Sequence, residues 1–252
     1  MDEQVETVGV ERLDKALVLR KLVLSRERAK VLIKKGSVRV SGQIITLPSH
    51  EVSEGDLLEL LEADIPWVSR SAIKLDHALT LWGIDPSGLV CLDIGASTGG
   101  FTEVLLSRGA ARVYAVDVGH DQLHEKLRSD KRVISMEGVH VNMMDGSEIP
   151  EAIDFVVIDV SFISLTKVLG RAKLFMKHDA RMIALVKPQF EVGREAINKG
   201  IVKDKKLRER ALESVRQFTS VAGLIVENET ISPIKGGDGN EEYLLHLTSA
   251  KD

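Results

Sequence analysis

From about residue 70 onward, short apolar runs alternate with segments whose apolar residues recur at helical spacing. The runs that read as strands are LVCLDIG, ARVYAVDVG, RVISM, IDFVVIDVS, ARMIALVKP, LIVENETISPI and YLLHLTSA. Helical patterns lie between them, for example Leu75, Ala78, Leu79 and Trp82, and again LRERALESVRQF. This alternation predicts a doubly wound, Rossmann-like α/β sheet of seven strands, with ligands at the carboxyl ends of its strands.

The first sixty residues have a different pattern. Two sets of apolar residues there have helical spacing: Leu13, Ala16 and Leu17, then Ala29, Leu32 and Ile33. Ser25 is suited to cap the second helix and Gly36 to end it. The stretch SVRVSGQIITLP alternates around Ser41-Gly42 as a short hairpin does, and DLLEL predicts a further strand. We therefore expect a small α+β domain over residues 1–62, a linker over 63–69 that contains Pro66, and a large α/β domain over 70–252.

Composition narrows the class of protein. The 252 residues are 44% hydrophobic and 29% charged, which is ordinary for a soluble globular protein and excludes wholesale disorder. The single cysteine, Cys91, cannot form an internal disulfide. The polar start MDEQVETVGVER is unlike a signal peptide, and no apolar run approaches the length of a membrane span. We expect a cytoplasmic protein.

Charge is unevenly distributed behind the net value of −4. Residues 11–40 hold ten Lys or Arg against three acidic residues, whereas residues 51–64 hold six acidic residues and no basic one. The cations of the two helical segments are Arg12, Lys15, Arg20, Lys21, Arg26, Arg28, Lys30, Lys34 and Lys35. A solvated helical face is one interpretation. Because acids are scarce among these bases, we favour binding to a polyanion such as RNA, which gains affinity by releasing counterions.

The glycine-rich turn GASTGG follows a predicted strand and precedes a predicted helix, which is typical of a cofactor site. A dinucleotide fingerprint requires glycine where this chain has Ser97, and D-x-G-x-x-x-G-G instead suits an S-adenosylmethionine-dependent methyltransferase. Asp93 is placed to meet the ammonium group of the methionine portion, and Asp117 to bind the ribose hydroxyls. A bare structural turn and a nicotinamide site remain alternatives. The candidate cofactor-binding residues are Asp93, Gly95, Ala96, Ser97, Gly99, Gly100, Phe101, Asp117, Val118 and Asp159.

Four charged residues stand where an α/β sheet places reactive groups. Asp159 and Lys187 follow two predicted strands, Glu242 precedes the last strand, and Lys74 lies in SRSAIKL before the first. Taken singly, each has a structural explanation, such as an ion pair or a surface lysine.

These segments together resemble the TlyA family. The resemblance rests on SRSAIKL, DIGASTGGFTEVLL, VDVGHDQL, VIDVSFISL, LVKPQFEVGRE and SPIKGGDGNEEYLLHL, and the start ERLDKALVLRKLVLSRERAKVLIKKG is similar to an S4 RNA-binding domain. The resemblance implies an S4 domain joined to an FtsJ-like methyltransferase domain. It further implies S-adenosylmethionine-dependent 2′-O-methylation of a ribose, that of a cytidine in ribosomal RNA, with ribosomal subunits as partners.

In this family a Lys-Asp-Lys-Glu tetrad carries catalysis, and the matching residues are Lys74, Asp159, Lys187 and Glu242. The residue types suit the chemistry, because a ribose hydroxyl is a poor nucleophile that must lose its proton as the methyl group is transferred. Lysines stabilise the developing alkoxide, and carboxylates orient the lysines.

The chain departs from the family pattern at a few positions. Ser71 and Ala72 replace two glycines ahead of Lys74, which predicts an altered approach of that lysine. His140 and Asn142 replace an asparagine and an arginine after the third strand, and Glu125 replaces a tryptophan. We expect these changes to affect how RNA is positioned and to leave the tetrad intact.

Other functions remain open at this point. A catalytically silent RNA-binding or ribosome-assembly protein is one, and a haemolysin-type membrane-lytic protein, which the history of the family suggests, is another. His120 and His124 have a spacing that can bind metal, but no third ligand is evident and we expect no metal site. The polar segment EVGREAINKGIVK is either a solvated loop or a flap that faces RNA.

Overall fold

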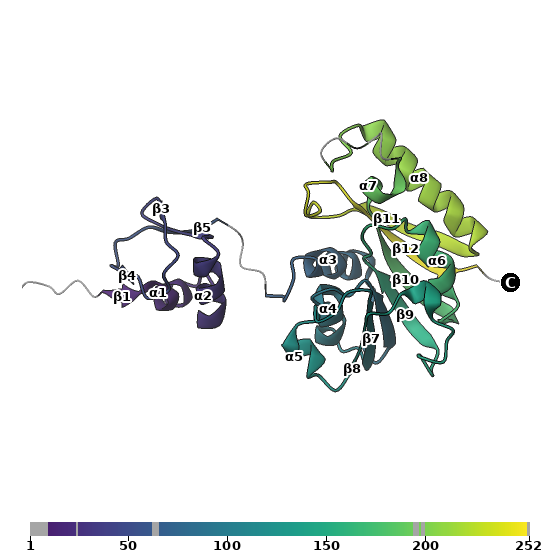
Figure 1. Cartoon of the computed structure of the whole chain (residues 1–252), viewed down its shortest axis with the longest axis horizontal. Coiled ribbons are helices and arrows are strands. Elements are labelled where there is room, and N and C mark those ends of the chain that lie inside the picture. Colours follow the sequence, from purple (N-terminus) through teal and green to yellow (C-terminus); the bar gives the residue numbers. More distant parts are fainter. Residues whose placement is uncertain (1–9, 24, 62–65, 194–196, 198–199, 251–252) are drawn as a thin grey trace, which may run out of the picture. The chain divides into compact units, whose positions relative to one another are not determined.

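A computed structural model of the chain describes residues 10–23, 25–61, 66–193, 197 and 200–250. The chain divides into two compact units, Met1–Pro66 and Trp67–Asp252 (Figure 1). Residues 63–65 of the expected linker lie outside the described residues, and Trp67 and Val68 pack against the core of the second unit.

The first unit is a small α+β structure with two helices, α1 (Leu13–Leu19) and α2 (Arg26–Lys34). Ser25 caps α2 as expected, since its Oγ accepts a hydrogen bond from the Arg28 backbone N–H at 3.3 Å. The strands are β1 (Glu11–Arg12), β2 (Val38–Val40), β3 (Gln43–Ile44), β4 (Glu51–Val52) and β5 (Leu58–Leu60). They form a β3-β2-β5 sheet and a β1-β4 pair. The core combines residues with helical spacing from both helices with Val23 and strand residues. Its buried members are Leu13, Ala16, Leu17, Val23, Ala29, Ile33, Val38, Val40, Val52 and Leu58.

The second unit is built on a seven-stranded sheet in the order β11-β12-β10-β9-β6-β7-β8. All seven strands expected from the apolar runs are present. Their bounds are β6 Val90–Ile94, β7 Arg112–Asp117, β8 Val133–Glu137, β9 Ile153–Ile158, β10 Met176–Val186, β11 Leu224–Ile231 and β12 Tyr243–Ser249. Strands β8, β7, β6, β9 and β10 are parallel, and β12 runs antiparallel between β10 and β11.

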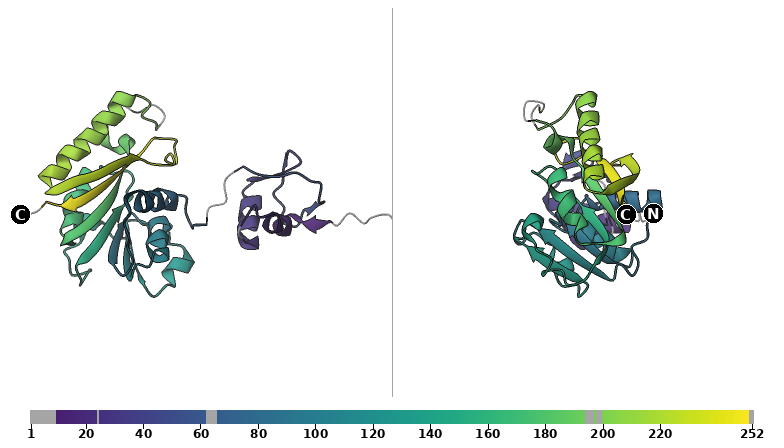
Figure 2. Two further views of the ribbon diagram at one scale, coloured as in Figure 1. Left: turned by 180° about the vertical axis from the view of Figure 1, so that it is seen from behind. Right: turned by 90° about the vertical axis from the view of Figure 1, so that its right-hand side faces the viewer.

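Helices cover both faces of this sheet (Figures 1 and 2). On one face, α3 (Ala72–Trp82) and α4 (Gly100–Ser107) pack on one buried cluster, and on the other α6 (Thr166–Lys173) and α8 (Lys205–Val221) pack on a second. Among the described residues, this unit also has the short helices α5 (Glu125–Arg128) and α7 (Pro188–Glu191) and the 3₁₀ turn η1 (Val141–Met143). Because successive side chains of a strand point to opposite faces, Leu92 and Cys91 belong to different clusters.

Candidate active site

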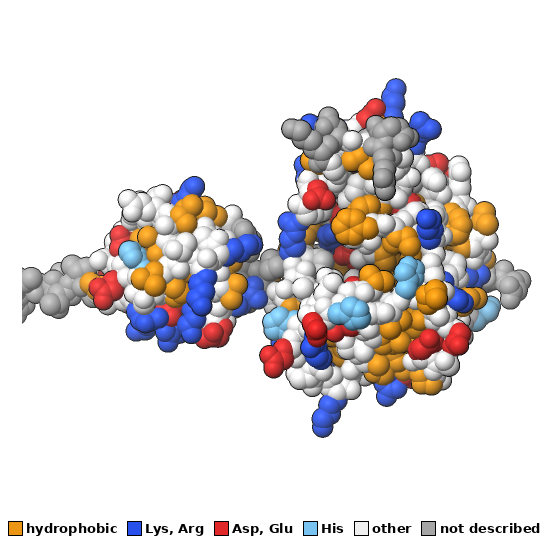
Figure 3. Space-filling model, viewed as in Figure 1, with side chains coloured by type: hydrophobic (Ala, Val, Ile, Leu, Met, Phe, Trp, Pro, Cys, Tyr) orange, Lys and Arg blue, Asp and Glu red, His pale blue; other side chains and the backbone are white. Residues whose placement is uncertain are grey.

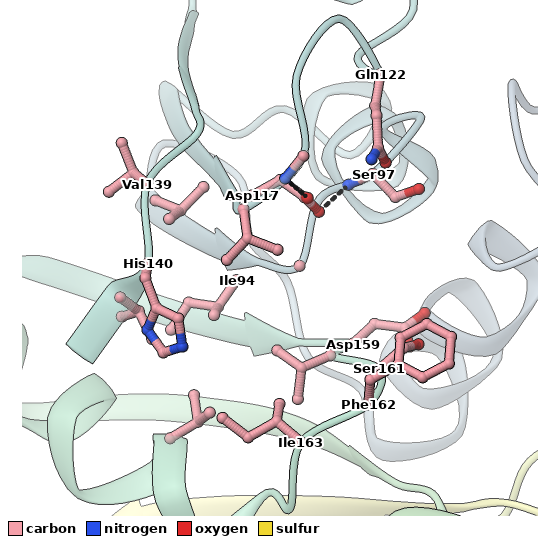
Figure 4. A pocket seen from close by; sticks show the side chains of 17 residues that line it. Ile94, Ser97, Asp117, Gln122, Val139, His140, Asp159, Ser161, Phe162 and Ile163 are labelled. Atoms are coloured by element: carbon pink, nitrogen blue, oxygen red, sulfur yellow. Dashed lines mark hydrogen bonds between the residues drawn. The ribbon is translucent and has the colours of Figure 1, made fainter. Parts of the chain in front are cut away.

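Two adjoining cavities lie at the carboxyl ends of the parallel strands. The larger has a volume of about 380 Å³ and is bordered by the ends of β6, β7 and β9 and by the segment 139–141 (Figure 4). The smaller, of about 150 Å³, is lined by Ser69, Ser71, Gly95, Ala96, Ser97, Phe101, Asp159, Ser161 and Lys187. The two share Gly95, Ser97, Asp159 and Ser161, so the glycine-rich turn forms a wall of both.

Close backbone approach explains two glycines of this turn. Gly95 has φ +85°, and a Cβ there would lie 2.6 Å from the carbonyl oxygen of Asp159. A Cβ on Gly100 would lie 2.2 Å from Ser71 Oγ, so helix α4 packs tightly on the turn that leads into α3. The turn therefore requires glycine for contact as well as for conformation. Gly99 lies behind the turn, against Leu127 and Leu123, and borders neither cavity.

Asp117, the last residue of β7, fixes the rim of the larger cavity. Its Oδ2 accepts a hydrogen bond from the Ser97 N–H at 2.8 Å, and its Oδ1 accepts one from the Gly119 N–H at 2.7 Å (Figure 4). Each carboxylate oxygen keeps a further lone pair that can accept a bond from a ligand hydroxyl. Val118 lies beside it on the wall and is 63% exposed.

Asp93 does not reach either cavity, contrary to the contact with the cofactor ammonium expected from the sequence. Its side chain is fully buried, and Oδ2 accepts a hydrogen bond from Thr102 Oγ1 at 2.6 Å. Burial raises the pKa of this carboxyl to about 7. Strand register places Asp93 opposite Ala115 and Val157, two residues short of Asp117 and Asp159, so its side chain stays buried against α4 instead of reaching the ends of the strands.

Lys187 forms the first of two buried lysine–carboxylate pairs. Its Nζ lies 2.6 Å from Asp159 Oδ1 and donates a hydrogen bond to Ser161 Oγ at 2.8 Å. Lys187 follows the end of β10 and Asp159 the end of β9, two neighbouring parallel strands. The smaller cavity borders all three side chains, which leaves room for a reacting group beside the ammonium.

Lys74 and Glu242 form the second pair, with Nζ and Oε2 2.6 Å apart. Their side chains are only 7% and 2% exposed. Lys74 comes from the first turn of α3, and Glu242 from the residue ahead of β12. Strand register brings the two pairs together, since Val186 lies opposite Tyr243 and one further step places Lys187 opposite Glu242.

The substitutions ahead of Lys74 do not disturb it. Ser71 has φ −57° and ψ −30°, and Ala72 begins α3, so neither position has a conformation that needs glycine. Lys74 therefore reaches Glu242 from an ordinary helix. Of the other departures, Glu125 begins α5, and His140 lies on the wall of the larger cavity, where its Nδ1 accepts a hydrogen bond from the Asn142 N–H.

Some residues of the site were not foreseen from the sequence. Ser161, two residues after Asp159, is the hydroxyl that completes the surroundings of Lys187. Glu191 joins α7 to the loop after Asp159, because its carboxylate accepts bonds from Ser164 Oγ at 2.6 Å and the Leu165 N–H at 2.8 Å. Burial raises the pKa of Glu191. Only its place in the motif LVKPQFE could have drawn attention to it.

Phe162 stands at the mouth of the larger cavity. Its side chain is 91% exposed, and its φ of 65° lies in the left-handed region that a phenylalanine rarely adopts. Its ring lies 5.3 Å from that of Phe190 at an angle of 50°. An exposed, conformationally strained aromatic residue at a cavity mouth is typical of a functional surface rather than of a core.

In the first unit, Lys and Arg side chains gather over the helices (Figure 3). Asp14 is fully buried and binds the guanidinium groups of Arg12 at 3.0 Å and Arg26 at 2.9 Å, which lowers the pKa of Asp14 to about 2. Arg20 donates to the backbone carbonyls of Asp56 at 2.6 Å and Ser53 at 2.8 Å. Arg20 therefore holds the loop ahead of β5, whereas Arg12 and Arg26 keep about half of their side chains exposed.

The other candidate RNA-binding cations are exposed or partly buried on the surface of this unit. Lys15, Lys21 and Lys34 are exposed, and Lys30 pairs with Glu27 on the surface at 2.7 Å. Lys35 is exposed and Arg28 partly buried.

The described residues contain neither a cluster of metal-ligand side chains nor a helix suited to span a membrane. No three His, Cys, Asp or Glu side chains there gather closely enough to hold a metal ion. His124 caps α5, and the ring of His120 lies against Gly138. In the same part of the chain, no helix combines the length and apolar character needed to cross a bilayer.

Residues 67–249 match the model of the FtsJ-like methyltransferases. The chain belongs to this family. Residues 11–58 match the S4 domain, which is the first unit of this FtsJ-like protein. Part of the segment EVGREAINKGIVK, residues 191–203, lies outside the described residues.

Known relatives of this FtsJ-like protein share nearly its whole length. It is 42% identical to Hemolysin A of Brachyspira hyodysenteriae, over 94% of this chain and 99% of that one. It is also 42% identical to the 16S/23S rRNA (cytidine-2′-O)-methyltransferase TlyA of Mycobacterium tuberculosis, over 96% and 91% of the two chains. A solved hemolysin-type structure from Streptococcus thermophilus is 39% identical and superposes with a TM-score of 0.76, over 98% and 90% of the two chains.

The residues of the larger cavity fit S-adenosylmethionine. Asp117 offers carboxylate lone pairs at the strand end where a ribose would lie, and the backbone of Gly95 lines both cavities. Val118, Val139 and Val141 supply apolar walls that suit an adenine ring. The adjoining smaller cavity leads from this site to Lys187.

Proposed function

We propose that this protein transfers a methyl group from S-adenosylmethionine to the 2′-hydroxyl of a cytidine in ribosomal RNA. The observation that carries the proposal is the Lys187–Asp159 ion pair at the smaller cavity, which adjoins the larger cavity that fits the methyl donor. The Lys74–Glu242 pair lies next to it, because Glu242 stands opposite Lys187. The name of the Mycobacterium tuberculosis relative supplies the nucleotide and the kind of RNA.

The roles follow from the contacts. S-adenosylmethionine supplies an electrophilic methyl group on its sulfonium sulfur. We assign the departing hydroxyl proton to Lys187, whose Nζ is held by Asp159 and Ser161 at the smaller cavity. Lys74, oriented by Glu242, adds positive potential for the developing alkoxide. Since these groups are already fixed by their partners, little reorganisation is needed at the moment of reaction.

The S4 unit supplies the second part of the function. Its two helices and the residues that flank them carry the exposed cations that we assign to RNA backbone contacts: Arg12, Lys15, Lys21, Arg26 and Lys34. Such contacts bind RNA without reading sequence, so the choice of nucleotide rests with the methyltransferase unit. We propose ribosomal subunits as its partners and, with them, a cytoplasmic location.

The test is methyl transfer to separated, unmodified 30S and 50S particles with tritiated S-adenosylmethionine. We expect label in RNA, at a ribose that resists alkaline cleavage, and loss of label in Lys187→Ala. Lys177→Ala is the matched control, because Lys177 lies on β10, the strand that Lys187 follows, is exposed and pairs with Asp154. Binding of the cofactor without label in any RNA would overturn the proposal and favour a silent RNA-binding protein. Cofactor-independent lysis of membranes would favour the haemolytic alternative.

A further inference from the structure

The side chain of Asn240 lies two residues ahead of Glu242 and is only 1% exposed. Both ends of its carboxamide are used. Nδ2 donates a hydrogen bond to the carbonyl oxygen of Gly200 at 2.7 Å, and Oδ1 accepts one from the Val202 N–H at 2.9 Å. A single buried side chain thus joins the loop ahead of β12 to the segment 200–202.

The same loop is in contact with the carboxylate of Glu242. The carbonyl oxygen of Asn240 accepts a bond from the Gly236 N–H at 2.8 Å, which closes the loop 236–240. A Cβ on Gly236 would lie 2.5 Å from Glu242 Oε1. The backbone of Gly236 therefore packs against Oε1 of Glu242, the oxygen that does not bind Lys74. The backbone carbonyl of Asn240 holds Gly236 in this place.

A second link runs parallel to the first. Arg208 of α8 donates to Val202 O at 3.2 Å and Lys203 O at 2.8 Å, and its Nε donates to Glu241 Oε1 at 3.1 Å. The segment 200–203 is consequently tied to residues 240 and 241, which directly precede Glu242. Of these ties, only that of Asn240 is a buried amide with both donor and acceptor satisfied.

We propose that Asn240 is a positioning residue for methyl transfer: it fixes Glu242, and through Glu242 the ammonium of Lys74, against the segment 200–202. This rests on the proposed function of the tetrad. Only a carboxamide side chain satisfies both neighbours. The Val202 N–H needs a hydrogen-bond acceptor and the Gly200 carbonyl needs a donor, and a carboxamide carries both on one carbon. A carboxylate would face the Gly200 carbonyl and add a negative charge near Glu242.

The test compares Asn240→Asp and Asn240→Ala with the wild type in the labelling assay. A displacement of a catalytic group by about 1 Å lowers the rate by about 100-fold, so we expect kcat to fall by about 30- to 100-fold. The Kd for S-adenosylmethionine and the KM for the ribosomal particle should stay within about twofold, since Asn240 borders neither cavity.

Asn228→Ala is the matched control. Its amide nitrogen lies 3.1 Å from Nδ1 of the buried His246 on the same sheet, away from the tetrad. We expect it to lower the Tm as the Asn240 variants do, while kcat is kept. Equal kcat in the Asn240 and Asn228 variants would overturn the positioning role.

A double-mutant cycle separates positioning from general damage. In a Glu242→Gln background, Asn240→Asp should add less than about a twofold loss, because the group that it positions is already altered. An undiminished loss in that background would place the effect of Asn240 elsewhere. If the wild type itself labels no RNA, the proposed function fails rather than this inference.

Discussion

The ammonium of Lys74 and the carboxylate of Glu242 meet at 2.6 Å although 168 residues separate them in sequence. One comes from the first turn of a helix on the face of the sheet, the other from the loop ahead of an antiparallel strand. Both side chains are nearly inaccessible to water. Each charge is therefore tolerated only because the other is present.

This dependence can be measured as stability. Lys74→Met or Glu242→Leu alone should lower the free energy of unfolding by about 3–5 kcal/mol, because each leaves an unpaired buried charge, and the double variant should recover most of that loss. Both tryptophans, Trp67 and Trp82, lie in the second unit, so their fluorescence in urea reports on that unit. Simple additivity of the two losses would contradict the coupling.

Ser161→Ala should slow methyl transfer by about 10-fold. The hydroxyl accepts a bond from Lys187 at 2.8 Å, and a hydrogen bond to a charged group contributes about 1.5–3 kcal/mol. The affinity for S-adenosylmethionine should change little. Single-turnover rates at saturating cofactor provide the measurement, with Ser107→Ala, on α4 away from the cavities, as the control. Unchanged rates would show that Asp159 alone orients Lys187.

Asp117→Ala should raise the Kd for S-adenosylmethionine by about 10- to 100-fold, as loss of charge-assisted hydrogen bonds does. Part of this loss of affinity comes from the Ser97 and Gly119 N–H groups, because the variant removes the carboxylate that accepts their hydrogen bonds. Asp121→Ala is the control, since Asp121 is exposed nearby and bonds only loosely to Arg128. Calorimetric titration of both variants gives the comparison, and equal affinities would remove Asp117 from the site.

Asp93 predicts a dependence of stability on pH. Its pKa is about 7 in the folded protein against an ordinary value of 3.8. The unfolded chain thus loses this proton first, so the contribution is fully present below about pH 4 and is lost as the pH rises through 7. Asp93→Asn, which cannot ionise, should be more stable than the wild type at pH 8 by at most about 4 kcal/mol.

Near pH 4 the two proteins should unfold at similar denaturant concentrations. The variant should also bind S-adenosylmethionine within about twofold of the wild type, because Asp93 borders neither cavity. A large loss of affinity would instead restore the contact expected from the sequence.

In the S4 unit, Arg20 and Lys34 should behave differently. Arg20→Ala should speed hydrogen exchange in residues 51–60, since two backbone carbonyls lose their donor. Lys34→Ala should leave exchange unchanged, weaken RNA binding uniformly and reduce the salt dependence by about one counterion. Binding to a ribosomal RNA fragment at several salt concentrations tests this. An unchanged slope would exclude Lys34 from the RNA surface.

The strands were predictable because each buried strand is a continuous apolar run, and Ser25 was predictable because capping is local. The place of β12 between β10 and β11 was not, since strand order depends on contacts distant in sequence. Asp93 and Asp117 have the same residue type at similar strand positions, yet only one faces the cavity. Strand register places Asp93 opposite Ala115, two residues short of Asp117 on the same face of the sheet, and a sequence pattern fixes strand ends less accurately than that.

The order of the strands also determines when, during synthesis of the chain, the reaction centre can form. At about 5–20 residues per second, the ribosome needs about 10–30 s to extend the chain from Lys74 to its partner. Until β12 has emerged and inserted between its neighbours, Glu242 is missing and the reaction centre is incomplete. A nascent copy therefore cannot yet methylate RNA, including the RNA of the ribosome that is translating it.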